Sequence, residues 1–133
     1  MVKKTPSPAK LRELVMQALY QKEMTGSSNT DLIKQFKQNY RNLNLKDFET
    51  YLKEIKQNIL DIDSTIAKHT NINIDQISKI ELAILKQAIY EIKESNLDKP
   101  VIISEAIRLA KRFGQDSSHK FVNALLDLSL IHI

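Results

Sequence analysis

The chain has 133 residues, of which 42% are apolar and 27% are charged, and its formal net charge is +4. This length suffices for one domain with a hydrophobic core, and this composition excludes a disordered tail. The chain contains no cysteine and only two glycines, Gly26 and Gly114, which excludes a disulfide framework, a zinc finger, a thiol nucleophile and a glycine-rich phosphate loop.

The excess positive charge lies at the start of the chain. Four basic residues precede the first acidic residue, Glu13, and they are Lys3, Lys4, Lys10 and Arg12. The other 16 of the 20 basic residues balance the 16 acidic ones. We therefore expect a flexible basic arm over residues 1–7 on a neutral body, which favours an anionic partner at that end. There is neither a signal peptide nor a run of about 20 apolar residues, so we expect a cytoplasmic protein with no membrane contact.

Helical patterns begin near the N-terminus. Ser7 is suited to cap a helix with Pro8 in its first position, and apolar residues at helical spacing continue to about Met24. The segment 26–29 predicts a break in the helix, and a second, short helix follows with Tyr40 near its end. Residues 39–44 are polar and typical of a loop.

One long helix is predicted next, because apolar residues recur at steps of four and three. These residues are Phe48, Leu52, Ile55, Ile59, Ile62 and Ile66. Such a seam packs against other helices, and we expect both Ile55 and Ile59 to be buried.

A broad apolar face from Ile77 to Ile92 predicts a central helix that ends near Ser95. Asp75 or Ser78 is expected to cap it. Ser78 and Glu81 have the spacing of a capping box, in which each side chain bonds the other residue's backbone N–H.

The last section contains two further predicted helices. We expect Val101–Ile103 to form a buried lead-in to a helix that Ser104 caps, with Gly114 as the residue that closes it. A final helix is predicted to start at Asp116 or Ser117. With no repeat and no linker, the chain is predicted to be a single all-α domain over residues 1–133, a bundle of six or seven helices.

The sequence offers little catalytic chemistry. His69, His119 and His132 are far apart, and Ser117, Ser118 and His119 are adjacent helical residues whose side chains diverge. We therefore expect no enzyme, no metal site and no cofactor.

A basic and aromatic cluster surrounds Gly114. Its members are Arg108, Lys111, Arg112, Phe113, Lys120 and Phe121. Cations attract phosphates and an exposed aromatic ring can stack on an unpaired base, so the cluster suits RNA if the N-terminal arm packs near it. The alternative is that both phenylalanines belong to the core and the cations form a solvated helix face.

The chain resembles the NusB family of transcription antitermination factors. The matching segments are Pro100, Ile103–Ile107, Leu109–Gly114, Ser118–Asn123 and Leu126–Asp127, then Ile80–Glu81, Ala83–Lys86 and Tyr90–Glu91, and Gln17–Tyr20. The resemblance implies two packed helical subdomains. It also implies an RNA-binding adaptor that pairs with NusE, a ribosomal small-subunit protein, on single-stranded boxA RNA. Such a complex helps RNA polymerase read through terminators, notably on ribosomal RNA operons.

The resemblance also implies site residues. Those expected to bind RNA are Lys3, Lys4, Lys10, Arg12, Lys111, Arg112, Lys120 and Phe121. Those expected to face NusE are Tyr20, Asp75 and Glu81. Each also has a structural alternative: Tyr20 suits the edge of the core, and Asp75 and Glu81 suit helix caps. Pro8 and Ala9 stand where relatives are often basic, and Ser117 stands where some carry an acid. The thinner basic motif leaves open a helical protein-interaction module that has reduced or lost RNA binding.

Overall fold

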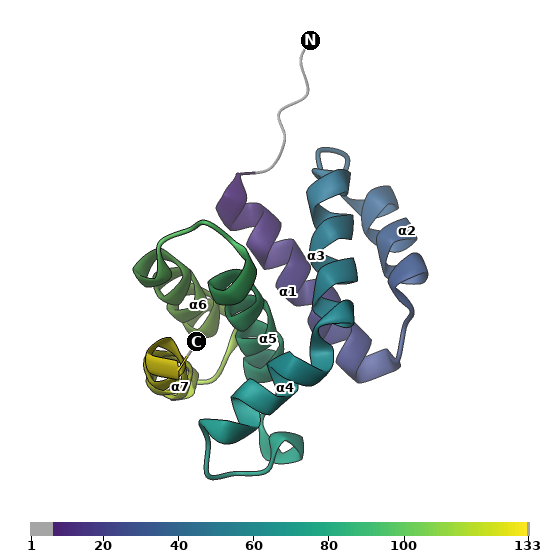
Figure 1. Cartoon of the computed structure of the whole chain (residues 1–133). Coiled ribbons are helices and arrows are strands. Elements are labelled where there is room, and N and C mark those ends of the chain that lie inside the picture. Colours follow the sequence, from purple (N-terminus) through teal and green to yellow (C-terminus); the bar gives the residue numbers. More distant parts are fainter. Residues whose placement is uncertain (1–6, 133) are drawn as a thin grey trace.

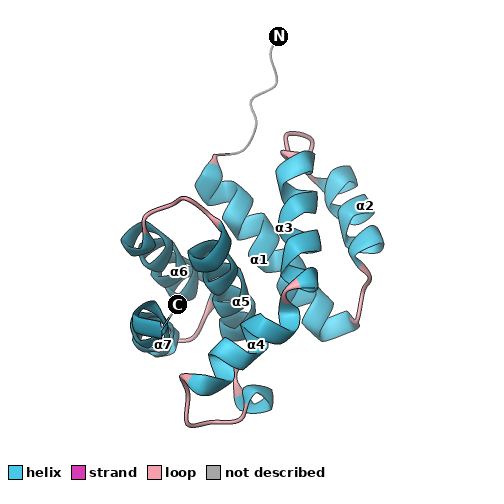
Figure 2. Cartoon of the chain, in the orientation of Figure 1, coloured by secondary structure: helices cyan, strands magenta, loops and turns pink. Residues whose placement is uncertain are grey.

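The computed structural model describes the backbone of residues 7–132 and the side chains of residues 7–127. Lys3, Lys4 and most of the predicted arm lie outside the described residues. The described part contains seven α-helices and one short 3-10 helix, with no strand (Figure 2). The predicted all-α fold is therefore confirmed.

The first helix begins as predicted, and the second begins at the last residue of the predicted break. Helix α1 (Pro8–Thr25) is capped by Ser7, whose hydroxyl accepts the backbone N–H of Lys10 at 3.2 Å. Gly26 closes α1 with a left-handed backbone, φ 72°, a conformation that favours glycine. Helix α2 (Asn29–Asn39) follows, capped by Ser28.

The predicted long helix is in fact two helices, α3 (Leu45–Gln57) and α4 (Ile59–Lys68), that meet at Asn58. The Asn58 side-chain amide donates to the carbonyl of Glu54 at 2.8 Å, and the backbone of Asn58 leaves the helical region at φ −105°, ψ 13°. This local bond competes with the helical pattern and turns the chain. The seam still faces inward on both sides of the break, except that Ile59, next to the turn, is only half-buried.

The predicted central helix is confirmed as α5 (Lys79–Glu94), which follows a 3-10 turn, η1 (Ile74–Gln76). Every residue from Leu82 to Ile92 is buried, because α5 packs against α1, α3, α4, α6 and α7. Ser78 caps α5 by accepting the N–H of Glu81 at 3.2 Å. The return bond of the capping box is absent among the described contacts, since the Glu81 carboxylate accepts a hydrogen bond from Ser118 instead.

Two predictions about helix α6 (Lys99–Phe113) were wrong. Asp98, and not Ser104, occupies the N-cap, because Pro100 fits the first turn and lets the helix start there. Val101 lies within this helix and is 46% exposed, so it is not part of a buried lead-in.

Gly114 closes α6 with an extended backbone rather than a left-handed one. A Cβ at Gly114 would lie 2.6 Å from the Ser118 Cβ and 2.7 Å from the Ala110 carbonyl oxygen, so a glycine is required by close approach. Helix α7 (Ser118–His132) starts directly after this turn.

Helix α5 lies at the centre, and five of the other helices pack around it (Figure 1). Helices α1, α2 and α3 form one subdomain, and α4 to α7 form the other. The described side chains of both contribute to one continuous apolar core. Among the described residues, no helix combines the length and the apolar character needed to cross a membrane.

Candidate nucleic-acid interface

The start of α1 lies against the last turns of α6. The Arg112 guanidinium pairs with the Glu13 carboxylate at 3.1 Å, and Arg108 donates to the backbone carbonyl of Ala9 at 3.2 Å. Lys10 pairs with the same carboxylate at 3.5 Å. Lys10 of α1 therefore meets Arg108 and Arg112 of α6 on one side of the molecule, whereas residues 1–6 of the predicted arm lie outside the described residues.

Lys10 and three cations of the cluster around Gly114, Lys111, Arg112 and Lys120, are exposed to solvent. Glu13 is 4% exposed and partly offsets Lys10 and Arg112, whereas Lys111 and Lys120 form no ion pair among the described residues. The Arg112 guanidinium lies over the Phe113 ring at 5.1 Å from its centroid, a cation–π contact. We call Lys10, Lys111, Arg112, Lys120 and Phe121 the basic surface.

The two phenylalanines lie between the two predicted alternatives. Phe113 and Phe121 both pack against the core, and both remain partly exposed. Phe121 lies in the first turn of α7, next to the exposed Lys120. A half-exposed ring beside an ammonium group has the chemistry to stack on a base and contact the adjacent phosphate.

The turn that carries Lys120 and Phe121 is held by buried hydrogen bonds. Ser118 is 1% exposed, and its hydroxyl accepts the backbone N–H of Gln115 at 3.0 Å and donates to the Glu81 carboxylate at 2.6 Å. The Gly114 backbone packs against the same serine. The first turn of α7 is therefore fixed to the start of α5.

Arg12 does not belong to this surface. It is 6% exposed, and its guanidinium donates to Glu91 at 2.8 Å and to Glu105 at 3.4 Å. Tyr51 donates its hydroxyl to the same Glu91 carboxylate at 2.9 Å. In the structure Arg12 therefore joins α1 to α5 and α6. The Arg12 side chain, which was predicted to bind RNA, is buried and already paired with two carboxylates.

Electrostatics support this assignment. Burial by itself lowers the pKa of Arg12, but Glu91, together with Tyr51 and Glu105, outweighs burial and the pKa is raised. Burial, followed by the charge of Glu91, raises the pKa of Tyr51. Both groups therefore keep their protons at every physiological pH.

The residues expected to face NusE lie on three elements. Tyr20 is half-buried on α1, Asp75 is exposed on η1, and Glu81 is half-buried at the start of α5. The ion pair between Glu23 and Lys79, 3.9 Å long, brings the last turns of α1 beside the first turn of α5. The Glu81 carboxylate already accepts a hydrogen bond from the Ser118 hydroxyl within the fold.

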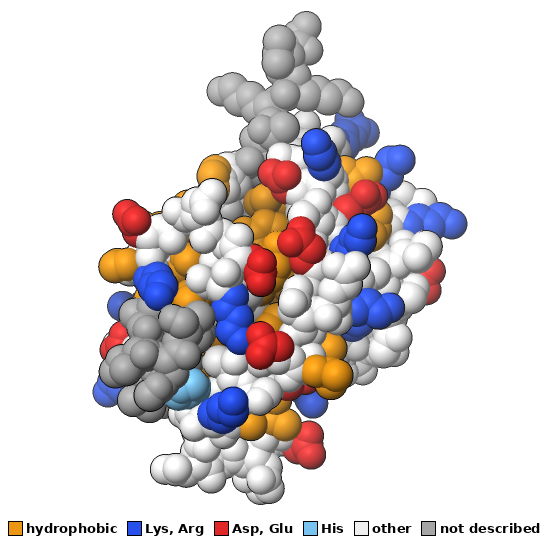
Figure 3. Space-filling model, viewed as in Figure 1, with side chains coloured by type: hydrophobic (Ala, Val, Ile, Leu, Met, Phe, Trp, Pro, Cys, Tyr) orange, Lys and Arg blue, Asp and Glu red, His pale blue; other side chains and the backbone are white. Residues whose placement is uncertain are grey.

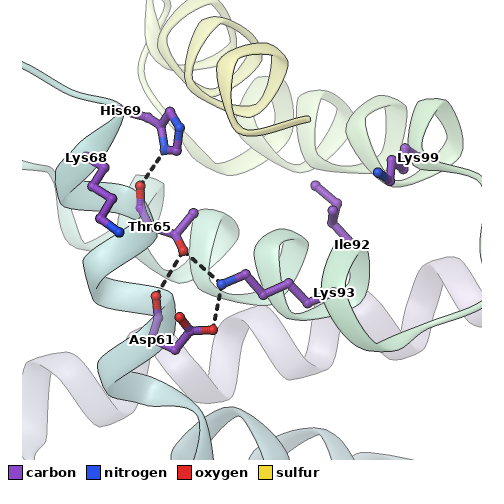
Figure 4. A pocket seen from close by; sticks show the side chains of 7 residues that line it. All are labelled: Asp61, Thr65, Lys68, His69, Ile92, Lys93 and Lys99. Atoms are coloured by element: carbon purple, nitrogen blue, oxygen red, sulfur yellow. Dashed lines mark hydrogen bonds and ion pairs between the residues drawn. The ribbon is translucent and has the colours of Figure 1, made fainter. Parts of the chain in front are cut away.

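A separate polar groove of about 830 Å³ lies between α4, α5 and α6 (Figure 4). Lys93 crosses it to reach Asp61 at 2.6 Å and Thr65 at 2.9 Å, and His69 contacts the carbonyl of Thr65 at 2.7 Å. These side chains bond to one another and to the backbone, which is typical of contacts that hold neighbouring helices together rather than of a reactive site. The described residues also contain no group of three acidic or histidine side chains that would hold a metal ion.

Sequence reasoning missed the ion network around Arg12. Its partners lie 79 and 93 residues away, and no local spacing relates them. Arg108 was noticed as a cation of the cluster but not as the residue that ties α6 to the α1 backbone.

Fold and site together define an all-helical protein that presents a basic, partly aromatic surface. The model of the NusB family matches residues 9–129, and the chain belongs to this family. The transcription antitermination protein NusB of Tolumonas auensis is 36% identical over 121 residues, which cover 89% of this chain and 88% of that protein.

Solved structures agree with this assignment. T. maritima NusB superimposes with a TM-score of 0.85 at 28% identity, covering 96% of this chain and 92% of that one. NusB in a crystal structure of NusB and NusE with double-stranded RNA has the same fold, with a TM-score of 0.83 at 21% identity over 94% of this chain and 96% of that one.

Proposed function

We propose that this chain is a cytoplasmic, non-catalytic antitermination factor that binds RNA without a cofactor. In this proposal it holds single-stranded boxA RNA together with NusE in the antitermination complex of RNA polymerase. Polymerase then reads through terminators, notably on ribosomal RNA operons. Family membership supports the antitermination role, and the solved complex of a relative with NusE and RNA supports the choice of partners.

The observation that carries the proposal is the joining of α1 to α6. Because Arg112 reaches Glu13 and Arg108 reaches Ala9, Lys10 lies on the same side as Arg108 and Arg112, with Lys111 next to Arg112 on α6. Cations on one side can follow a phosphate backbone, and Phe121 next to Lys120 adds a ring for a base. Lys3 and Lys4 would extend this surface from the arm. Tyr20, Asp75 and Glu81 are the proposed contacts with NusE.

A titration of single-stranded boxA-like RNA with the full chain tests the proposal. RNA affinity should rise when NusE is present and should fall as salt increases, because phosphate contacts release counterions. The variant Lys111→Ala/Lys120→Ala should bind more weakly. Lys34→Ala/Lys37→Ala on α2, which removes two exposed lysines elsewhere, is the matched control and should bind like the parent. Absence of RNA binding at low salt with NusE present would refute the proposal.

A second candidate is a helical protein-interaction module with reduced or lost RNA binding. The burial of Arg12 favours it, since the motif at the start of α1 then contributes only Lys10 as an exposed cation among the described residues. In that case NusE binding persists, while Phe121→Ala leaves RNA affinity unchanged.

A further inference from the structure

A cleft of about 340 Å³ opens at the far end of α1 from the basic surface. Leu19 of α1, Leu52 and Ile55 of α3, and Ile59 of α4 form its apolar wall. Lys10 and Lys22 are 12 residues apart on α1, which is about 18 Å along a helix axis. The cleft is thus distinct from the basic surface.

Two residues that directly follow lining residues in the sequence carry large, exposed apolar side chains. Leu60, which follows Ile59, is 83% exposed, and Met24, which follows Glu23 of the cleft, is 57% exposed. Figure 3 shows hydrophobic side chains on the surface where α3 passes into α4. Exposed aliphatic groups next to an apolar cleft are typical of a protein-binding surface.

The rim of the cleft is cationic. Lys22, Lys56 and Lys86 line it together with the Glu23 carboxylate. Lys86 is 8% exposed and pairs with Glu23 and with Asp63, so its charge is largely offset within the fold. Lys22 bonds the Asn29 side-chain oxygen at 2.6 Å instead of a carboxylate, and Lys56 forms no ion pair among the described residues. Burial, then the charges of Lys56 and Lys86, lower the pKa of Lys22. The positive potential at the rim is therefore only partly neutralised.

We propose that this cleft docks an acidic protein segment that inserts a bulky aliphatic side chain between α1, α3 and α4. Charge complementarity selects an acidic partner for Lys22 and Lys56, the two rim lysines that have no carboxylate partner among the described residues. Protein fits better than RNA, because the wall is aliphatic and offers no aromatic ring on which a base would stack. The partner also differs from one that meets Asp75 and Glu81, since those carboxylates suit a basic surface.

Two fluorescent 18-residue helical peptides test the proposal with the full chain. Both carry leucines at i, i+3, i+4 and i+7, and the remaining positions are mainly Glu in one and mainly Lys in the other. The acidic peptide should bind and the basic one should not. Lys56→Glu and, independently, Leu60→Ser should each weaken acidic-peptide binding by about tenfold. Both residues are exposed, so the fold is expected to persist, and circular dichroism checks it.

Lys37→Glu on α2 is the matched charge reversal and should change acidic-peptide binding by less than about twofold. A single-stranded RNA oligonucleotide is titrated in parallel. The proposal is overturned if the acidic peptide does not bind, if it binds the Lys56→Glu and Leu60→Ser variants as it binds the parent, or if Lys56→Glu weakens RNA binding and leaves peptide binding unchanged.

Discussion

Arg12 and Arg112 are both near the start of α1, yet they belong to different environments. Arg12 is enclosed between α1, α5 and α6 and pairs with Glu91 and Glu105. Arg112 lies on the surface, where it pairs with Glu13 and covers Phe113. Burial therefore decides whether a cation of this region stabilises the fold or is available to an anionic partner.

The largest expected effect tests the interior role. Arg12→Ala should lower the free energy of unfolding by about 3–5 kcal/mol, because Glu91 would be left buried without its cation. Arg112→Ala is the control and should cost less than about 1 kcal/mol, since exposed pairs contribute little. Urea unfolding measures both, and equal losses would remove the distinction between the two arginines.

The second prediction sharpens the contrast between fully buried and half-buried positions on the apolar seam. Ile55→Ala should cost about 2–5 kcal/mol, because this side chain is 1% exposed and its removal leaves a cavity. Ile59→Ala should cost clearly less, since Ile59 is half-buried at the α3–α4 turn. Denaturant midpoints compare the two variants, and a larger loss for Ile59 would contradict the described break at Asn58.

The third prediction concerns the basic surface. Phe121→Ala should weaken RNA binding by about 1–3 kcal/mol if one base stacks on the ring. Fluorescence anisotropy with labelled RNA measures the affinity, and thermal unfolding of the same variant shows whether the fold persists. A folded variant with unchanged affinity would leave Phe121 as an edge of the core.

The smallest prediction tests the helix caps. Ser78→Ala should lower the free energy of unfolding by about 1 kcal/mol, because the Glu81 N–H loses its acceptor. Ser104→Ala is the matched control: Ser104 lies exposed inside α6 and not at its cap, so this change should be nearly neutral. Chemical denaturation distinguishes them, and the reverse ranking would restore the cap that the sequence predicted at Ser104.

The sequence predicted the helices well where local physics decides them. Ser7 with Pro8, the apolar period of α5 and the breaks near Gly26 all depend on neighbouring residues. Prediction failed at Asn58, where one side-chain bond to Glu54 interrupts a regular seam. It also failed at Val101, because β-branched residues and a proline suit either a lead-in or the first turn of a helix.

The candidate site was predictable in part. The cluster of Lys111, Arg112 and Lys120 can be recognised from the positions of these residues in the sequence, and all three side chains are exposed. The enclosure of Arg12 was not predictable, because it depends on Glu91 and Glu105 far along the chain. The use of Glu81 by Ser118 likewise arises only when α5 and α7 pack together.

The most direct test of the central claim is the salt dependence of RNA binding with NusE present. For the parent chain, the logarithm of affinity should fall linearly with the logarithm of salt concentration. Lys111→Ala/Lys120→Ala should reduce this slope by about 1.4, since each phosphate contact to single-stranded RNA contributes about 0.7. Lys34→Ala/Lys37→Ala should leave the slope unchanged. Equal slopes for all three proteins would contradict the assignment of the basic surface to RNA.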